Sequence, residues 1–144
     1  MRMRSFIFFL LLSVHGILLA QETLVMPVVR VYDGDTIMSN MGMLPCPLCH
    51  VSIRIRGIDT PEYGSKASCS SEGEKAVQAK EHLKKILGDS KFVTITNFKW
   101  DKYGGRIDAD VFVGGVNVAE LLIKGGYARQ YDGKTKLGWC DGLN

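Results

Sequence analysis

One long helical pattern interrupts a series of short strand patterns. Between residues 71 and 87 apolar side chains recur at helical spacing, and Gly88 follows as a stop signal. Ser71 and Glu74 have the spacing of a capping box, which predicts that the helix begins near Ser71. The apolar face would consist of Ala76, Ala79, Leu83 and Ile86. Because strand patterns both precede and follow this helix, few folds can accommodate the chain.

The strand patterns are bounded by glycine, proline and aspartate residues. Residues 24–40 predict a strand, a turn at Asp33-Gly34-Asp35 and a second strand. The further expected strands are 50–57, 91–98 and 106–113, and a short helix is expected at 118–124. Three strands, a helix, two strands and a helix indicate a mainly β, α+β fold. We expect a five-stranded OB-fold barrel with two to three helices, a fold whose members bind oligonucleotides or oligosaccharides.

The first twenty residues read as an export signal. A basic start, MRMR, is followed by the apolar run SFIFFLLLSVHGILLA, and cleavage is expected between Ala20 and Gln21. The run is short for a membrane span, which needs about 20 apolar residues, so an uncleaved anchor is the weaker alternative. We therefore predict a signal peptide at 1–20 and one domain at 21–144, exported to the periplasm or the medium. After cleavage no stable membrane association is expected.

Net charge gives little information about the partner. The chain has 18 basic and 15 acidic residues, a formal charge of +3. Loss of Arg2 and Arg4 with the signal would leave 16 basic residues against 15 acidic ones, so the mature protein would be almost neutral. A nucleic-acid site must then come from a local cluster of residues and not from the overall charge.

Two acidic turns contain the residues that indicate a metal site. Asp35 follows the Asp-Gly turn, and Asp59 follows the third strand pattern. If the first three strands form a meander, both turns lie at one end of the sheet, where Asp35, Asp59 and the Thr60 carbonyl could bind Ca²⁺ or Mg²⁺. Pro61 restricts the backbone before Glu62, so this carboxylate has a defined direction and could orient or deprotonate a water molecule.

Arginine residues beside these turns suggest a phosphate as the substrate group. Arg54 and Arg56 share one face of the third strand, and Arg106 begins the fifth. A guanidinium group matches two phosphate oxygens, and together with a metal and a carboxylate it could promote attack of water on a phosphodiester. Each feature has a simpler explanation: a plain turn, a solvated strand face or a helix cap. Alternation alone does not decide between Arg54 and Arg56.

Three motifs in this order, VYDGDT, RIRGIDTPE and DKYGGR, resemble the staphylococcal nuclease-like (thermonuclease) family. The similarity extends over roughly residues 25–131. It implies an OB-fold barrel and a Ca²⁺-dependent phosphodiesterase site for DNA and RNA. We therefore expect a monomeric, exported endonuclease whose substrate is DNA, RNA or both. A non-catalytic OB-fold module that binds nucleic acid is the alternative.

The resemblance also implies roles for individual residues. It selects Arg54 over Arg56 as the first catalytic arginine, with Glu62 as the catalytic carboxylate and Arg106 as the second arginine. The implied metal ligands are Asp35, Asp59 and Thr60. The implied nucleotide contacts are Tyr103 and Tyr131.

Four cysteines lie in the exported part of the chain. In an oxidising compartment an even number favours disulfides over free thiols. Cys46 and Cys49 are close in sequence and are expected to pair with each other, which leaves Cys69 with Cys140. A thiol oxidoreductase built on Cys46-Pro47-Leu48-Cys49 is a weaker hypothesis, because such motifs need a helix start and here a strand pattern follows.

Overall fold

The computed structural model describes residues 21–46, 49–102 and 104–140, so the expected signal segment and Tyr103 lie outside the described residues. Its longer strands are β1 (Thr23–Pro27), β3 (Thr36–Asn40), β4 (His50–Ile55), β6 (Phe92–Trp100) and β7 (Arg106–Val113). The two-residue strands of the described chain are β2 (Arg30–Val31), β5 (Ile58–Asp59), β8 (Val116–Asn117) and β9 (Arg129–Gln130). The helices are α1 (Ser70–Leu87), α2 (Val118–Lys124) and a 3₁₀ turn, η1 (Gly64–Lys66).

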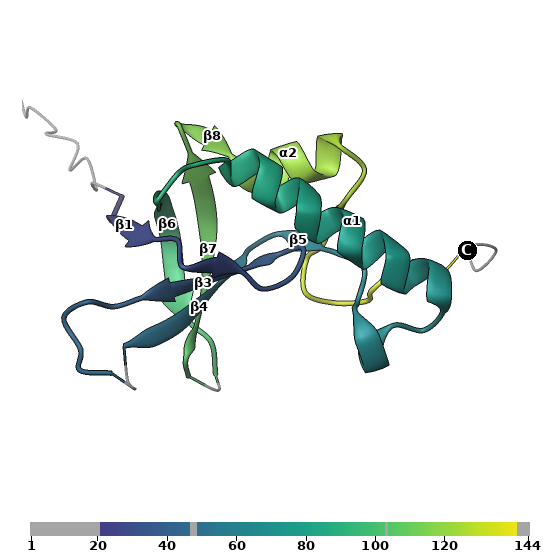
Figure 1. The fold of residues 1–144 in the computed structure, drawn as a ribbon, viewed down its shortest axis with the longest axis horizontal. Helices are drawn as coiled ribbons and strands as arrows, with labels where there is room; N and C mark the ends of the chain where they lie inside the picture. Colours follow the sequence, from purple (N-terminus) through teal and green to yellow (C-terminus); the bar gives the residue numbers. More distant parts are fainter. Residues whose placement is uncertain (1–20, 47–48, 103, 141–144) are drawn as a thin grey trace, which may run out of the picture.

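The first strand closes the sheet into a barrel. The sheet order is β1-β6-β7-β4-β3-β2, with β4 and β7 parallel and the other neighbouring pairs antiparallel. Only Val28 and Val29 separate β1 from β2. The N–H of Val28 donates to Lys91 at one end of the sheet, and that of Val29 donates to Met38 at the other. One bent strand thus pairs with both ends of the sheet, which confirms the expected five-stranded barrel (Figure 1).

Alternation of side chains puts one face of every long strand into the barrel. Ile53 and Ile55 of β4 and Ile95 of β6 are completely buried, while the residues between them are wholly or partly exposed. Leu83 of α1 and Leu122 of α2 complete this core, and α1 lies across one side of the barrel (Figure 1). None of the helices in the described part of the chain is long and apolar enough for a bilayer crossing.

Helix α1 begins differently from the expectation. Its N-cap is Cys69, which makes no capping hydrogen bond with its side chain, so the capping box of Ser71 and Glu74 is wrong. The reason lies in contacts that are distant in sequence. A disulfide to Cys140 holds Cys69, and Glu72 in the first turn accepts hydrogen bonds from the preceding loop instead. The chain therefore enters the helix earlier than its local pattern suggested.

Both expected disulfides are present. Cys46 pairs with Cys49, and Cys69 pairs with Cys140 across a separation of 71 residues. The second bond attaches the segment after β9 to the start of α1. The side chains of this segment reach the second acidic turn, where Lys136 contacts Asp59 and Glu62, and Trp139 contacts Asp59.

Candidate active site

The meander brings the two acidic turns together at one end of the barrel, as expected. The turn at Asp33–Asp35 joins β2 to β3, and the N–H of Ile55, the last residue of β4, donates to the Asp35 carbonyl at 2.8 Å. The turn is tightly packed: a Cβ on Gly34 would lie 2.9 Å from Ala79 Cβ of α1 and 3.1 Å from Thr60 Cβ. Only glycine therefore lets this turn approach the helix and the second acidic turn so closely.

Asp35 is 4% exposed and is held by three neighbours. Arg54 Nη1 donates to its Oδ1 at 3.0 Å, Thr36 Oγ1 donates to the same oxygen at 2.8 Å, and Thr60 Oγ1 donates to Oδ2 at 3.2 Å. Burial raises the pKa of Asp35 to about 6, although the charge of Arg54 and both hydroxyl groups act in the opposite direction. A buried carboxylate that is only partly compensated in this way is well suited to bind a cation.

The two arginines of β4 have different partners. Arg54 contacts Asp35, whereas Arg56 forms a two-pronged ion pair with Asp110, with Nε–Oδ1 and Nη2–Oδ2 distances of 3.0 and 2.7 Å. Arg56 also donates to the Asn97 carbonyl at 2.9 Å. Both donor edges of its guanidinium are therefore occupied by the sheet. Of the two, only Arg54 borders the cavity beside Asp35.

Asp59 is also 4% exposed, but its partners come from the C-terminal tail. Trp139 Nε1 donates to Oδ2 at 2.9 Å, and Lys136 Nζ lies 2.8 Å from Oδ1. Although ion-paired, Oδ1 is buried and receives no well-directed hydrogen bond. This oxygen therefore has the capacity to take a metal ion.

The backbone of Glu62 is fixed by a residue that the sequence argument missed. Glu72 is buried in the first turn of α1 and accepts from the N–H groups of Glu62, at 3.2 Å, and Ser68, at 2.7 Å. It thereby ties the acidic turn to the helix. The Glu62 side chain itself is 39% exposed and contacts Lys136 through Oε1, at 2.9 Å. Water can therefore reach this carboxylate.

The tail itself is held at several points. Besides the Cys69–Cys140 disulfide, Lys75 donates to the Trp139 carbonyl at 2.8 Å. The Arg129 guanidinium lies 4.0 Å from the centre of the Trp139 ring and donates to the Gly138 carbonyl. Burial of the Lys136 ammonium lowers its pKa, but its contacts with Asp59 and Glu62 more than offset this, so the pKa of Lys136 is raised. The ammonium is therefore charged where it meets both carboxylates.

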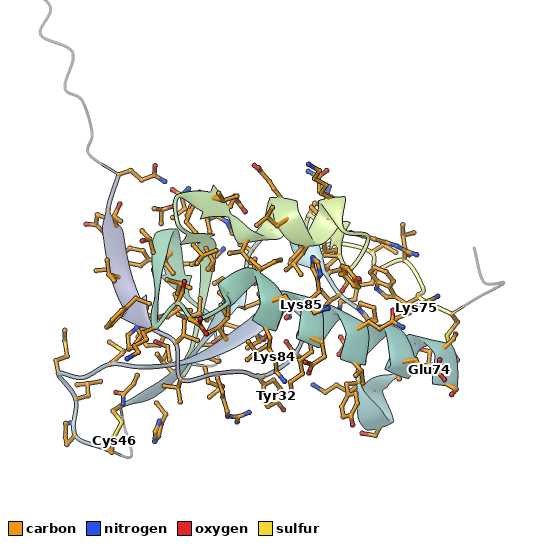
Figure 2. The ribbon with its side chains drawn as sticks, turned by 45° about the horizontal axis from the view of Figure 1, so that its top comes forward. Tyr32, Cys46, Glu74, Lys75, Lys84 and Lys85 are labelled. Carbon is orange, nitrogen blue, oxygen red and sulfur yellow. A yellow bond between two sulfur atoms is a disulfide. The ribbon has the colours of Figure 1, made fainter. Side chains whose placement is uncertain are left out.

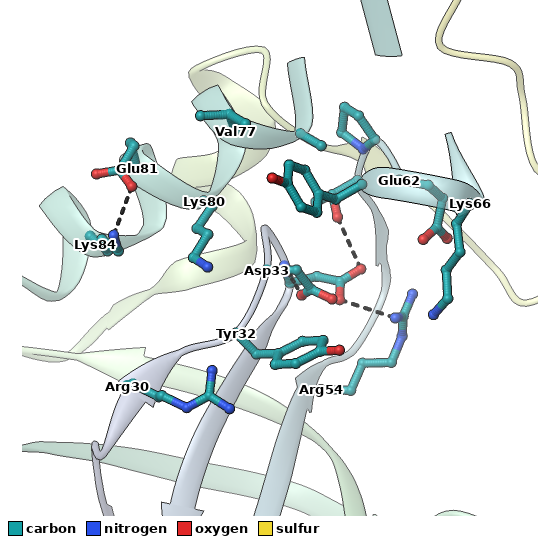
Figure 3. Close-up of a pocket in the computed structure, with 15 residues that line it drawn as sticks. Arg30, Tyr32, Asp33, Arg54, Glu62, Lys66, Val77, Lys80, Glu81 and Lys84 are labelled. Carbon is teal, nitrogen blue, oxygen red and sulfur yellow. Dashed lines mark hydrogen bonds and ion pairs between the residues drawn. The ribbon is translucent and has the colours of Figure 1, made fainter. Parts of the chain in front are cut away.

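A cavity of about 460 Å³ opens where these groups meet (Figure 3). It brings together Asp35, Arg54, Thr60 and Glu62, four of the residues expected in the site. Two further sets of side chains border it: Tyr63 and Lys66 from the loop after Glu62, and Arg30, Tyr32, Val77, Lys80, Glu81 and Lys84 from β2, its turn and α1. Strand β2, the turn after it and α1 thus form as much of the wall as the acidic residues do.

The other expected residues lie outside this cavity. Asp59 and Tyr131 border a second cavity of about 410 Å³ beside the tail. Arg106 pairs with Ser52 in the parallel register of β7 and β4, and its Nε lies 3.0 Å from Asp101 Oδ2. Since Ser52 and Arg54 share a strand face, Arg106 is on the side of the sheet where Arg54 lies, but it is engaged by Asp101 and Asp108. Tyr103 is outside the described residues.

The donor atoms at the acidic turns fit a hard cation. Asp35, Asp59 and the Thr60 carbonyl offer oxygen only, which suits Ca²⁺ better than Zn²⁺. Among the described residues, the two clusters of possible metal-ligating side chains both contain cysteines that are in disulfides, so neither suits a metal. The buried Oδ1 of Asp59, with its ion pair and no hydrogen bond, is the observation that favours a cation at the turns.

Residues 52–138 match the family model described as staphylococcal nuclease homologue. The chain belongs to this family. The match covers Arg54, Asp59, Thr60, Glu62 and Arg106 but begins after Asp35. No curated protein matches the chain in sequence. Membership supports an OB-fold with a nuclease-like or nucleic-acid-binding function, and the two disulfides suggest an oxidising environment.

Proposed function

We propose that this staphylococcal nuclease homologue is an exported, Ca²⁺-dependent endonuclease that hydrolyses phosphodiester bonds of DNA, RNA or both. The observation that supports it most is the shared cavity of Asp35, Arg54, Thr60 and Glu62. A carboxylate open to water, a guanidinium group and oxygen ligands for a cation are the groups that phosphodiester hydrolysis needs. Disulfides in the described chain, together with the signal pattern at 1–20, support export.

The roles of the side chains follow from their contacts. Glu62, anchored through its N–H to Glu72, takes a proton from a water molecule as that water attacks phosphorus. One ester P–O bond breaks, and the leaving oxygen takes up a proton from solvent. Arg54 donates to the non-bridging phosphate oxygens and stabilises the charge that develops on them. Arg106 would give a second such contact once the substrate draws it away from Asp101.

Asp35, Asp59 and the Thr60 carbonyl are the residues that would hold Ca²⁺. Bound there, the ion would supply positive charge to the phosphate. Lys136 contacts both Asp59 and Glu62, so its ammonium group would have to be displaced or shared when Ca²⁺ binds these carboxylates.

The decisive experiment is digestion of single- and double-stranded DNA and of RNA by the purified protein, with Ca²⁺ and with excess chelator. Cleavage should require Ca²⁺ and return when it is added back. Full activity in chelator would refute the metal assignment. Nucleic acid that is bound and never cut, with Ca²⁺ present, would instead identify the non-catalytic module.

Variants separate the roles within the site. Glu62→Gln, Arg54→Ala and Arg106→Ala should each lower the cleavage rate by about 10²-fold or more. Arg56→Ala is the matched control for Arg54, because it removes the same side chain from the same strand face but outside the cavity. It should cost much less. An inactive Arg56→Ala beside an active Arg54→Ala would reverse the assignment of the two arginines.

A further inference from the structure

The cavity continues beyond the groups that the proposed chemistry uses. One end is formed by Arg54, Glu62 and Lys66, and the other lies between the β2 segment and α1 (Figure 3). Arg30 and Tyr32 form the strand side of that second end. Its helix side is formed by Val77, Lys80, Glu81 and Lys84. None of these residues has a role in hydrolysis, yet they lie directly beside the proposed reaction centre.

Tyr32 has an unusual position for an aromatic residue. It is 52% exposed, although it stands between the buried Val31 and the turn of Asp33, and it borders the cavity. The Arg30 guanidinium lies 5.5 Å from the centre of its ring. Val77 on the facing helix is also exposed, at 45%. An exposed aromatic ring that borders the cavity offers a surface on which a flat ligand can stack, and Val77 adds apolar surface elsewhere on the cavity wall.

The charges around Tyr32 favour an anion. Arg30, Lys80 and Lys84 are basic, and the acidic groups here are Glu81 and Asp33. Lys84 Nζ lies 2.7 Å from Glu81 Oε1, and the hydrogen bond from Lys84 lowers the pKa of Glu81. Asp33 is partly occupied as well, since its Oδ1 accepts from the Asp35 N–H at 3.2 Å. Lys84 and Arg30 are exposed and Lys80 is partly exposed, and all three side chains are long enough to follow a phosphate backbone.

We propose that this end of the cavity is a subsite for the nucleotide next to the scissile phosphate in a single-stranded nucleic acid. Its base stacks on Tyr32, and its phosphate contacts Lys80 and Lys84. The inference rests on the proposed nuclease function, because it fixes which substrate that site prefers. A base in a duplex is covered on both faces by its neighbours, so only an unpaired nucleotide can lie on Tyr32. A volume of about 460 Å³ for the whole cavity fits one such group beside the reaction centre.

The test measures binding apart from cleavage. A fluorescent thymidine oligonucleotide of six residues and a fully paired, blunt-ended duplex are titrated into Glu62→Gln protein with Ca²⁺, and anisotropy gives the affinities. In this background Tyr32→Ala should weaken binding of the oligonucleotide roughly 5- to 150-fold, the range for loss of one stacked base. Tyr32→Phe keeps the ring and should stay within about twofold. Binding of the duplex should change little with either substitution.

Lysine variants test the phosphate contact. Lys84 and Lys85 are adjacent exposed residues of α1, but only Lys84 borders the cavity (Figure 2). Lys84→Ala should reduce the slope of log affinity against log salt by about 0.7, the value for one phosphate contact of a single strand. Lys85→Ala should leave the slope unchanged. Equal effects of the two substitutions would refute a contact at Lys84.

A small substrate separates this inference from the proposed function. A nitrophenyl phosphodiester has no neighbouring nucleotide to stack on Tyr32, so Tyr32→Ala should lower its cleavage much less than it lowers cleavage of the thymidine oligonucleotide. If the unaltered protein cleaves no phosphodiester, the proposed function fails, while a loss of oligonucleotide binding with Tyr32→Ala still supports the subsite. If cleavage is normal and Tyr32→Ala binds the oligonucleotide as tightly as before, the subsite alone is refuted.

Discussion

Asp35 and Asp59 are equally buried, but different parts of the molecule hold them. The partners of Asp35 are Arg54, Thr36 and Thr60, all on the strands and turns of the barrel. The partners of Asp59 are Lys136 and Trp139, about 80 residues further along the chain. Both are candidate ligands for the same ion, so one site is assembled from a barrel half and a tail half.

The difference shows what each half depends on. The barrel half needs only the meander of β2, β3 and β4, which the hydrophobic core stabilises. The tail after β9 has little apolar content of its own, and the Cys69–Cys140 disulfide attaches it to α1. Oxidation of one cysteine pair should therefore matter for Asp59 and have little effect on Asp35.

Removing the Cys69–Cys140 disulfide should have the largest effect on stability, and it acts on the tail half. Cys69→Ser with Cys140→Ser should lower the free energy of unfolding by about 4 kcal/mol, less any strain, because the closed loop is about 70 residues long. Urea denaturation measures the loss. Removing Cys46 and Cys49 together is the control, and the same relation gives about 2 kcal/mol for so short a loop. An equal effect of the two double variants would contradict a special role for the tail.

The charge state of Asp35 should have the next largest effect on the free energy of unfolding. Its pKa is raised from 3.8 to about 6, so without metal the folded state binds more protons than the unfolded state between these values. The free energy of unfolding must then fall as the pH rises from about 4 to 6. Asp35→Asn avoids this loss and should be more stable at pH 8 in chelator, by up to about 3 kcal/mol.

Binding of Ca²⁺ should reverse the order of stability of the unaltered protein and Asp35→Asn. An ion that binds the folded state stabilises the unaltered protein and has less to bind in Asp35→Asn. Denaturation of both proteins is measured from pH 4.5 to 8, with chelator and with Ca²⁺. The difference in their free energies of unfolding should have opposite signs in the two conditions. If the stability difference in chelator does not depend on pH, burial does not shift the pKa of Asp35 as stated.

The barrel half could be predicted from the sequence because its contacts follow from local patterns. The alternation of β4 and the two acidic turns imply where Asp35, Arg54, Thr60 and Glu62 meet once β3 and β4 are antiparallel. The choice of Arg54 over Arg56 is different. It depended on the family resemblance, since alternation places both arginines on one face, and the partner Asp110 lies 54 residues away.

The contacts of the tail half could not be predicted from the sequence, because they also join residues that are far apart in the chain. Lys136 meets Glu62 across 74 residues and Trp139 meets Asp59 across 80, and no local period encodes such contacts. Only the disulfide pairing hinted that the tail lies near α1. Glu72 was missed because the spacing of Ser71 and Glu74 gave a plausible cap. In the structure the N–H groups of Glu62 and Ser68 in the loop donate to Glu72 instead.

A substitution in the tightly packed Gly34 turn tests the barrel half, with a smaller expected effect on the free energy of unfolding. An added Cβ would lie 2.9 Å from Ala79 Cβ and 3.1 Å from Thr60 Cβ, so Gly34→Ala must push the turn away from α1. We expect a loss of about 2 kcal/mol in the free energy of unfolding. Gly42→Ala is the control, because a Cβ there meets nothing within 4 Å. Similar unfolding midpoints for the two variants would show that the turn yields without cost.

Substitution of Lys136 is the most specific test of the tail half and has the smallest expected effect, a change in Ca²⁺ affinity. Its ammonium group contacts Asp59 and Glu62, so in the metal-free protein it occupies charges that Ca²⁺ would use. Lys136→Ala removes this competition. Asp59 is buried but the Lys136 side chain is 42% exposed, so we take the value of a surface ion pair, about 0.2–1 kcal/mol, and expect Ca²⁺ affinity to rise by up to about fivefold. Calorimetric titration with Ca²⁺ measures it without reference to cleavage. Lys134→Ala is the control, because Lys134 is paired with Asp132 in the same tail and should leave the affinity unchanged. Weaker Ca²⁺ binding by Lys136→Ala would mean that the lysine holds Asp59 and Glu62 in place for the ion instead of competing with it.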